Sequence, residues 1–263
     1  MVLYPATVAR STPLDAISED DIASIEAREE LAELLGIARE TGTEADGLVY
    51  WTREEAGSIL NAVENENCDG VVLAIQADHT QRRRLLGGET VEKVLARAEC
   101  DVFTEKRGER GPAGEETPIE RILLTTSGGP HASLAADTAR ALALAADAHV
   151  DVVHFPGENS RAENREDGGA ILEAAQRILS EVENVETELA EAPDDVAEAI
   201  VARSEEYDKT VLGSPTSGLL RQFAFGTVPE SVNQQSENGV VVAQQDTRGA
   251  SMYDRWIVGD RTN

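Results

Sequence analysis

The stretch Thr210-Val211-Leu212-Gly213-Ser214-Pro215-Thr216, followed by Gly226-Thr227-Val228-Pro229-Glu230, decides the fold of this chain of 263 residues. A short apolar run ends in a loop of small residues, and a second glycine then begins a predicted helix. In an α/β fold this arrangement places backbone N–H groups and a helix N-terminus at the carboxyl end of a strand, where phosphate binds well. Glycine and serine also supply ordinary turn chemistry at such junctions, so the pattern alone leaves both roles open.

Outward from this stretch, predicted strands and helices alternate. Apolar runs typical of strands occupy residues 2–4, 48–51, 69–75, 101–103, 121–126, 150–155, 185–189 and 239–243. Helical periodicity covers residues 19–41, 54–66, 89–98, 132–146, 170–182 and 194–206. Because parallel strands buried on both faces read as continuous apolar runs, the pattern predicts an α/β fold with a mostly parallel sheet and helices on both faces.

The chain also contains an internal repeat. Residues 69–74 (Asp-Gly-Val-Val-Leu-Ala) align with residues 208–213 (Asp-Lys-Thr-Val-Leu-Gly), and residues 88–94 align with residues 226–232. Two matches in the same order, with similar flanking elements, indicate duplication. The strand and helix at 122–146 have no counterpart in the first copy. We therefore expect either that the chain is the cut end of a longer protein or that an element from elsewhere completes the first sheet.

The composition excludes some classes of partner. The chain has 50 acidic and 23 basic residues, a net charge of −27, and its lysines are Lys93, Lys106 and Lys209. Such a surface repels nucleic acid and anionic lipid, and no apolar run has the length or flanks of a membrane span or signal peptide. An acidic, lysine-poor composition resembles proteins of salt-loving archaea, whose cytoplasm screens self-repulsion; an ordinary acidic mesophile protein is the alternative.

The spacing of cysteines and histidines bears on the cellular compartment and on metal binding. Cys68 and Cys100 form no CxxC pair, which favours a reduced, cytoplasmic location. The four histidines show no ligand spacing, so no metal site is expected.

The stretch 210–230 and the internal repeat resemble the universal stress protein family in its tandem form. That family's phosphate loop reads Gly, two residues, Gly, nine residues, Gly, then Ser or Thr. Here Gly213, Thr216, Gly226 and Thr227 keep the spacing, with Thr216 replacing the middle glycine. The stretches 11–14 (Ser-Thr-Pro-Leu) and 127–131 (Ser-Gly-Gly-Pro-His) are similar to the stress-protein pairs at the cytoplasmic ends of archaeal amino-acid and cation transporters.

The resemblance implies two tandem units, each with a mostly parallel five-stranded sheet and helices on both faces, the first lacking its first strand and helix. It implies units at 1–106 and 118–246, a linker at 107–117 and a tail at 247–263. Family members pair through the last strand of each unit, so a homodimer or an internal pseudo-dimer is expected.

The resemblance also implies a nucleotide site in the second unit, for ATP or AMP with Mg²⁺. The residues expected there are Thr126 and Ser127 near the ribose and base, and Gly213, Ser214, Thr216, Gly226, Thr227 and Val228 around the phosphates. Ser127 stands where nucleotide-binding members carry Asp, which removes a charge-assisted hydrogen bond, and Thr216 adds a Cβ where close approach favours glycine. In the first copy, Ala74 and Glu89 replace Gly213 and Thr227, so binding is not expected there.

The residues that usually mark an enzyme are missing from the sequence. It has no Gly-x-Ser-x-Gly elbow, no Walker lysine after Thr227 and no dinucleotide fingerprint. His131, beside the second-unit loop, is expected to face solvent. We therefore expect a cytoplasmic, non-catalytic stress-response protein that binds ATP or AMP. The alternative is a nucleotide-free interaction module, the regulatory end of a membrane transporter.

Overall fold

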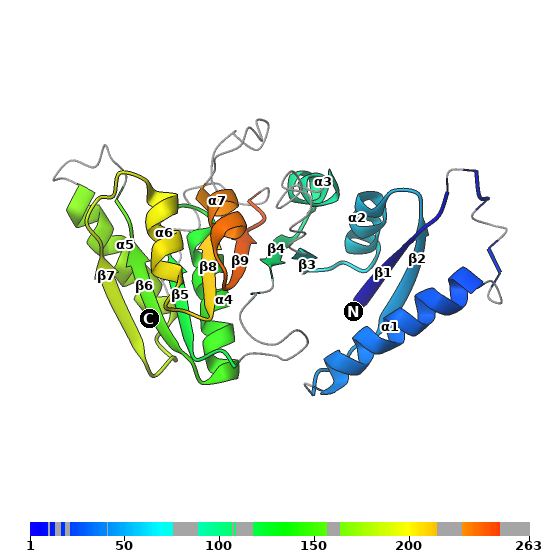
Figure 1. The fold of residues 1–263 in the computed structure, drawn as a ribbon, viewed down its shortest axis with the longest axis horizontal. Helices are drawn as coiled ribbons and strands as arrows, with labels where there is room; N and C mark the ends of the chain where they lie inside the picture. Colours follow the sequence, from blue (N-terminus) through cyan, green and yellow to red (C-terminus); the bar gives the residue numbers. More distant parts are fainter. Residues whose placement is uncertain are drawn as a thin grey trace, which may run out of the picture. The chain divides into compact units, whose positions relative to one another are not determined.

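A computed structural model describes residues 1–9, 11–13, 17–18, 22–40, 42–75, 89–106, 108, 118–156, 164–214 and 228–247. The chain packs as two compact units, one formed by Met1–Asp69 with Glu89–Glu99 and the other by Gly70–Gly88 with Cys100–Asn263 (Figure 1). The repeat and the packing thus divide the chain differently. Within the described residues, no helix combines the length and the apolar character that crossing a membrane requires.

The smaller unit is built on two parallel strands. Its elements are β1 (Val2–Thr7), α1 (Ile22–Glu40), β2 (Gly47–Thr52), α2 (Glu55–Asn65) and α3 (Glu89–Arg97). Val2 pairs with Gly47, and both α1 and α2 contact the two strands. Ser24, Ala27 and Leu31 form the buried stripe of α1 at helical spacing.

The larger unit contains a seven-stranded sheet in the order β3-β4-β9-β8-β5-β6-β7. Its strands are β3 (Gly70–Ile75), β4 (Asp101–Lys106), β5 (Arg121–Thr125), β6 (His149–His154), β7 (Val185–Leu189), β8 (Lys209–Gly213) and β9 (Gly239–Gln244). Its helices are α4 (Ala132–Ala146), α5 (Asn164–Ile178), α6 (Val196–Ser204) and α7 (Val228–Gln235). The pairing of β4 with β9 is antiparallel, and every other neighbouring pair of described strands in this sheet is parallel.

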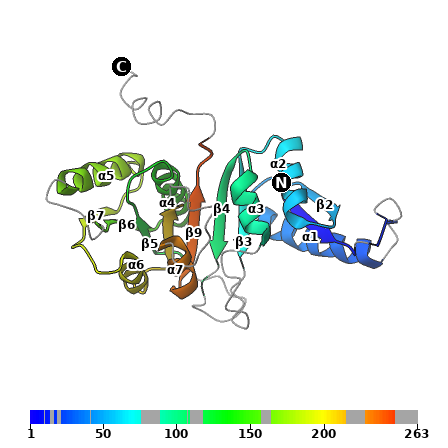
Figure 2. The same cartoon turned by 90° about the horizontal axis from the view of Figure 1, so that it is seen from above.

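Helices cover both faces of the second copy's strands. α4 and α5 contact each other on one face, and α6 and α7 on the other (Figure 2). Alternating strand residues fill the two cores: Leu124 and Val211 pack with the alanines of α4, whereas Leu212 and Val242 pack with Ile200 of α6. Because alanine side chains are small, the Ala-rich helix α4 can lie close to the sheet.

The strand order shows how the two copies of the repeat are related. In the second copy, β5 lies between β6 and β8 and joins the pairs β6-β7 and β8-β9. In the first copy the matching pairs are β1-β2 and β3-β4, and no described strand joins them. The expected pairing through last strands is found within one chain, because β4 and β9 end the two copies and pair with each other.

Most expected elements appear within a few residues of their predicted bounds. The strand expected at 101–103 is longer, Asp101–Lys106, and the helix expected at 194–206 begins after Asp195, whose Oδ1 accepts from the N–H groups of Ala197 and Glu198 at 2.7 and 3.1 Å. The linker 107–117, apart from Gly108, and the tail after Thr247 lie outside the described residues.

Candidate functional site

Four of the predicted residues lie at the carboxyl edge of two neighbouring strands. β5 and β8 are parallel, with Thr125 beside Leu212, so Thr126 and Ser127 after β5 lie at the same edge as Gly213 and Ser214. Strand order reverses at β5, since the chain continues to β6 on one side and returns through β8 on the other. Ligands of open α/β sheets bind at such switch points.

The remaining predicted residues fall into two groups. Val228 is the first residue of α7 and packs half-buried against the core that contains Leu212. Thr216, Gly226 and Thr227 lie outside the described residues.

The turn after β5 separates the roles of Thr126 and Ser127. Thr126 is buried: its N–H donates to the Val153 carbonyl at 3.1 Å, and its carbonyl accepts from His154 Nδ1 at 2.7 Å. Its Oγ1 accepts from the Gly128 N–H at 3.3 Å. Ser127 is exposed. Thr126 therefore builds the turn, and Ser127 presents its hydroxyl to solvent.

Two glycines carry the chain from this turn into α4. Gly128 and Gly129 have φ angles of 72° and 92°, in the left-handed region that favours glycine. The backbone of the loop 127–131 thus depends on the Gly-Gly pair.

His131 precedes α4 and is buried, with 8% of its surface exposed, so the expectation that it faces solvent is wrong. The Gln245 N–H donates to its Nδ1 at 3.0 Å, which places the proton of the neutral ring on Nε2. Burial lowers its pKa, against the raising effect of the Asp101 charge. His131 is therefore a neutral ring that ties the start of α4 to the end of β9.

Gly213 has a packing role that the sequence did not reveal. A Cβ at this position would lie 3.1 Å from the His131 carbonyl oxygen and 3.2 Å from its carbonyl carbon. Because these are backbone atoms, only a glycine lets β8 approach the start of α4 without a shift. The glycine is thus explained by packing whether or not phosphate binds beside it.

Serines near this edge bond to the end of β9. Ser214 donates its N–H to the Ala243 carbonyl at 2.8 Å and its Oγ to Gln244 Oε1 at 3.3 Å. Ser133, in the first turn of α4, donates to Gln245 Oε1 at 3.3 Å. These contacts hold β8, β9 and α4 together beside the exposed Ser127.

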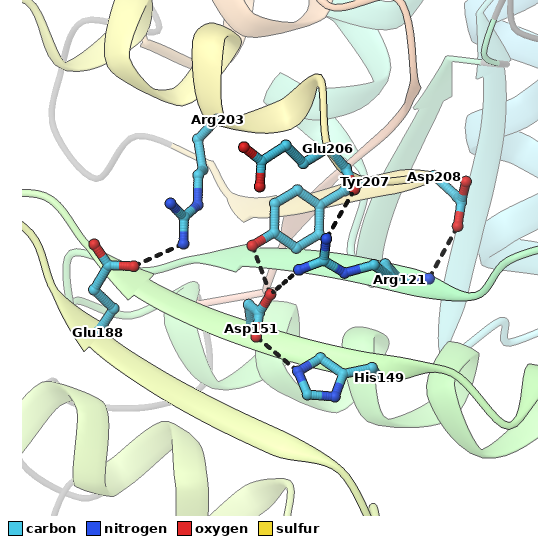
Figure 3. A network of polar contacts seen from close by, with 8 residues as sticks. All are labelled: Arg121, His149, Asp151, Glu188, Arg203, Glu206, Tyr207 and Asp208. Carbon is cyan, nitrogen blue, oxygen red and sulfur yellow. Dashed lines mark hydrogen bonds and ion pairs between the residues drawn. The ribbon is translucent and has the colours of Figure 1, made fainter.

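A second polar cluster lies at the opposite, amino edge of the same strands (Figure 3). Asp151 is buried at its centre: Oδ2 accepts from Tyr207 Oη at 2.6 Å and from Arg121 Nη2 at 2.9 Å, and His149 Nε2 lies 2.8 Å from Oδ1. The Arg121 guanidinium also covers the Tyr207 ring, 4.6 Å from its centroid. The cluster joins β5 and β6 to Tyr207, which lies just before β8.

The cluster shifts two pKa values in opposite directions. Burial and then the hydrogen bond to Asp151 raise the pKa of Tyr207 to about 12. For Asp151, burial acts to raise the pKa, but the hydrogen bonds from Tyr207 and His149 together hold it below its usual range. The cluster is thus a neutral phenol, a carboxylate and a guanidinium that satisfy one another.

Two groups of the cluster, with Glu186 of β7 near them, have the types of atom that bind metals. Ligand atoms of His149, Asp151 and Glu186 lie within 4.8 Å of one another. Both Asp151 oxygens already accept hydrogen bonds, and the Arg121 guanidinium beside them disfavours a cation. We assign His149 and Asp151 to the network and not to a metal.

Sequence reasoning did not find this network. Its residues are spread over 121–207, and the available signal was a single acidic residue, Asp151, between the valines of a strand.

Two stretches of the chain, residues 2–104 and 118–244, match the universal stress protein family (Usp). No curated protein sequence matches the chain significantly. The two matched stretches coincide with the two copies of the repeat.

Two solved structures that align with most of this chain show the same fold, and a third aligns with about half of it. A universal stress protein from Archaeoglobus fulgidus is 17% identical, with 93% of this chain and 86% of that one covered and a TM-score of 0.57. A putative universal stress protein from Pseudomonas aeruginosa is 19% identical, with 93% of each chain covered and a TM-score of 0.57. A universal stress protein in complex with cAMP covers 48% of this chain and 97% of its own, with 21% identity and a TM-score of 0.40. The match over most of its length shows that the chain belongs to the universal stress protein family, in a tandem form.

Proposed function

We propose that the chain is a non-catalytic stress-response protein. The second copy of its repeat binds an adenine nucleotide, AMP or ATP, at the carboxyl edge of β5 and β8. The observation that carries the proposal is the position of Thr126, Ser127, Gly213 and Ser214 at the switch point of the sheet, beside the start of α4. Two parallel strands end there, and the N–H groups of a helix N-terminus favour an anion.

Ser127 is the described side chain best placed to contact the sugar. It is exposed just after the carboxyl end of β5, whereas the hydroxyls of Thr126, Ser133 and Ser214 already make hydrogen bonds within the protein. A serine hydroxyl can both donate to and accept from a ribose hydroxyl. With ATP, Mg²⁺ would bind as the partner of the phosphates.

We propose no catalytic role for the described serines and His131 at this edge, because their contacts lie within the protein. Ser133 and Ser214 donate to glutamine oxygens and not to an imidazole, and His131 uses Nδ1 to accept a backbone N–H. A nucleophilic serine needs a base within hydrogen-bond reach. The described part of the edge contains no such serine–histidine pair.

Substitution of Ser127 tests the site. Loss of one neutral hydrogen bond, about 0.5–1.5 kcal/mol, should weaken AMP binding roughly two- to tenfold in Ser127→Ala. Ser127→Asp should strengthen it, because a carboxylate accepts from ribose hydroxyls with charge assistance. Ser180→Ala, an exposed serine just after α5, is the matched control. Equal AMP affinity in all three variants and the native chain would contradict the proposal.

A second candidate function is a nucleotide-free interaction module that docks on a membrane transporter in the cytoplasm. One observation favours it: packing against His131 explains Gly213, and bonding to β9 explains Ser214, without any ligand. Failure of the native chain to bind any nucleotide would favour this candidate.

A further inference from the structure

β3 lies at one end of the seven-stranded sheet but has the composition of an interior strand. Its residues 70–75 (Gly-Val-Val-Leu-Ala-Ile) include no charge, in a chain of net charge −27. β7, at the other end, carries the exposed Glu186 and Glu188. Edge strands of soluble proteins usually carry charges that block further pairing, whereas strands paired on both sides read as apolar runs.

One face of β3 is uncovered. Gly70, Val72 and Ala74 alternate along the strand and are exposed, with 65% of the Val72 surface accessible. In the repeat, Val72 corresponds to Val211 of β8, which is 0% exposed. A valine at the same strand position is therefore exposed to solvent in the first copy and buried in the second.

The second copy shows what buries this position. β5 pairs in parallel with β8 and places Leu124 beside Val211. The helix that follows β5 then packs over it, since Ala135 and Ala139 of α4 belong to the same core cluster as Val211. A strand and the helix after it together provide the cover.

The uncovered face continues a core that is already formed. Val72 pairs with Phe103 of β4, and Phe103 pairs with Ala243 of β9. Ala243 belongs to the core cluster of α4, and Phe103 packs against that cluster. The apolar surface thus runs from the α4 core across β9 and β4 to Val72, where cover ends.

We propose that the outer edge of β3 is a docking surface for a partner polypeptide that supplies an apolar strand parallel to β3, followed by a helix with small apolar residues. No described strand pairs with this edge. The register follows from β5 and β8: the partner residue that corresponds to Leu124 lies beside Val72. The partner's helix covers Val72 and Phe103 as α4 covers Val211. The proposal does not depend on nucleotide binding.

A synthetic peptide with the sequence of residues 119–146 of this chain serves as the probe, because it contains a strand and helix of the required kind. Binding to the full chain is measured by fluorescence anisotropy of a labelled peptide, and amide hydrogen exchange of residues 70–75 reports the position. The native chain should bind the peptide and protect these amides. A peptide with Leu124→Asp should not bind.

Variants at the two ends of the sheet distinguish binding at the β3 edge from non-specific binding of the peptide. Val72→Asp and Ala74→Asp should each weaken peptide binding at least about tenfold, because they place an unpaired charge in an apolar contact. Leu189→Asp, at the partly exposed end of β7, should leave binding unchanged. Circular dichroism checks that each variant is folded. We expect folding to be retained because the substituted side chains are exposed.

Two results would overturn the proposal. One is that the folded native chain does not bind the peptide, or binds it equally well after Val72→Asp and Ala74→Asp. The other is that the native chain sediments as a dimer that Val72→Asp converts to a monomer, which would make a second copy the occupant.

Discussion

The buried hydrogen bond between Tyr207 and Asp151 allows one contribution to stability to be worked out. Tyr207 is 1% exposed and packs against Leu123 and Val153. Its hydroxyl donates to Asp151 Oδ2 at 2.6 Å. Tyr207→Phe removes the hydroxyl and keeps the ring, while Arg121 and His149 remain on the carboxylate. The substitution therefore removes this bond, together with the interaction of the hydroxyl with Arg203, and changes the packing little.

A hydrogen bond to a charged group contributes about 1.5–3 kcal/mol. Because Arg121 shares the same oxygen, we expect a loss near the middle of this range, about 2 kcal/mol. For a domain of this size each kcal/mol moves the thermal midpoint by about 2–4 °C, so the midpoint should fall by roughly 4–8 °C.

Thermal and urea unfolding of the larger unit, followed by circular dichroism in concentrated KCl, measures this change. Tyr50→Phe, on β2 of the smaller unit and outside the network, is the matched control. A loss below about 0.5 kcal/mol for Tyr207→Phe would refute the account of the network, since that is the range of ordinary surface substitutions.

The same pair predicts the pH dependence of stability. The pKa of Tyr207 is raised to about 12 from an ordinary value of about 10, so its contribution is present below pH 10 and is lost as pH rises toward 12. The pKa of Asp151 is lowered, so its contribution is present above its ordinary value of about 3.9 and is lost as pH falls through the folded-state value. Tyr207→Phe should remove the alkaline loss that this residue causes.

Three further predictions follow from other features. Gly213→Ala should destabilise the larger unit by about 1–2 kcal/mol in urea unfolding, because its Cβ meets the His131 backbone; an unchanged midpoint would contradict this packing role. Asp195→Ala should cost about 1 kcal/mol through loss of the α6 cap, whereas Asp194→Ala should cost little; equal effects would argue against the cap. The thermal midpoint should rise as KCl increases to molar levels, because salt screens the net charge of −27; a falling midpoint would contradict the acidic-surface argument.

Sequence periodicity predicted the helices and strands well because the pattern that marks each of them lies within its own residues. Alternating apolar runs and helical stripes identified the strands and helices, and the repeat identified two copies. The pairing of β4 with β9 followed from the family resemblance and is confirmed. The division of the first copy's strands between two sheets depends on which strands meet in space, and no local pattern contains that information.

The candidate site was predicted less completely for a similar reason. Strand order brings Ser127 and Gly213 to one edge, as expected, but the burial of His131 depends on contact with Gln245, which lies far along the chain. The close approach of Gly213 to His131 is likewise a tertiary contact. Glycine in a phosphate-loop pattern and glycine at a tight packing contact look identical in sequence.

The central claim is that the second unit binds an adenine nucleotide. Titration calorimetry of the native chain with AMP, and with ATP and Mg²⁺, in multimolar KCl tests it most directly. The account predicts micromolar binding at about one site per chain, because among the described residues the switch-point edge with its exposed Ser127 is found in the second copy. Absence of heat at millimolar nucleotide, with the protein shown to be folded by circular dichroism, would contradict it.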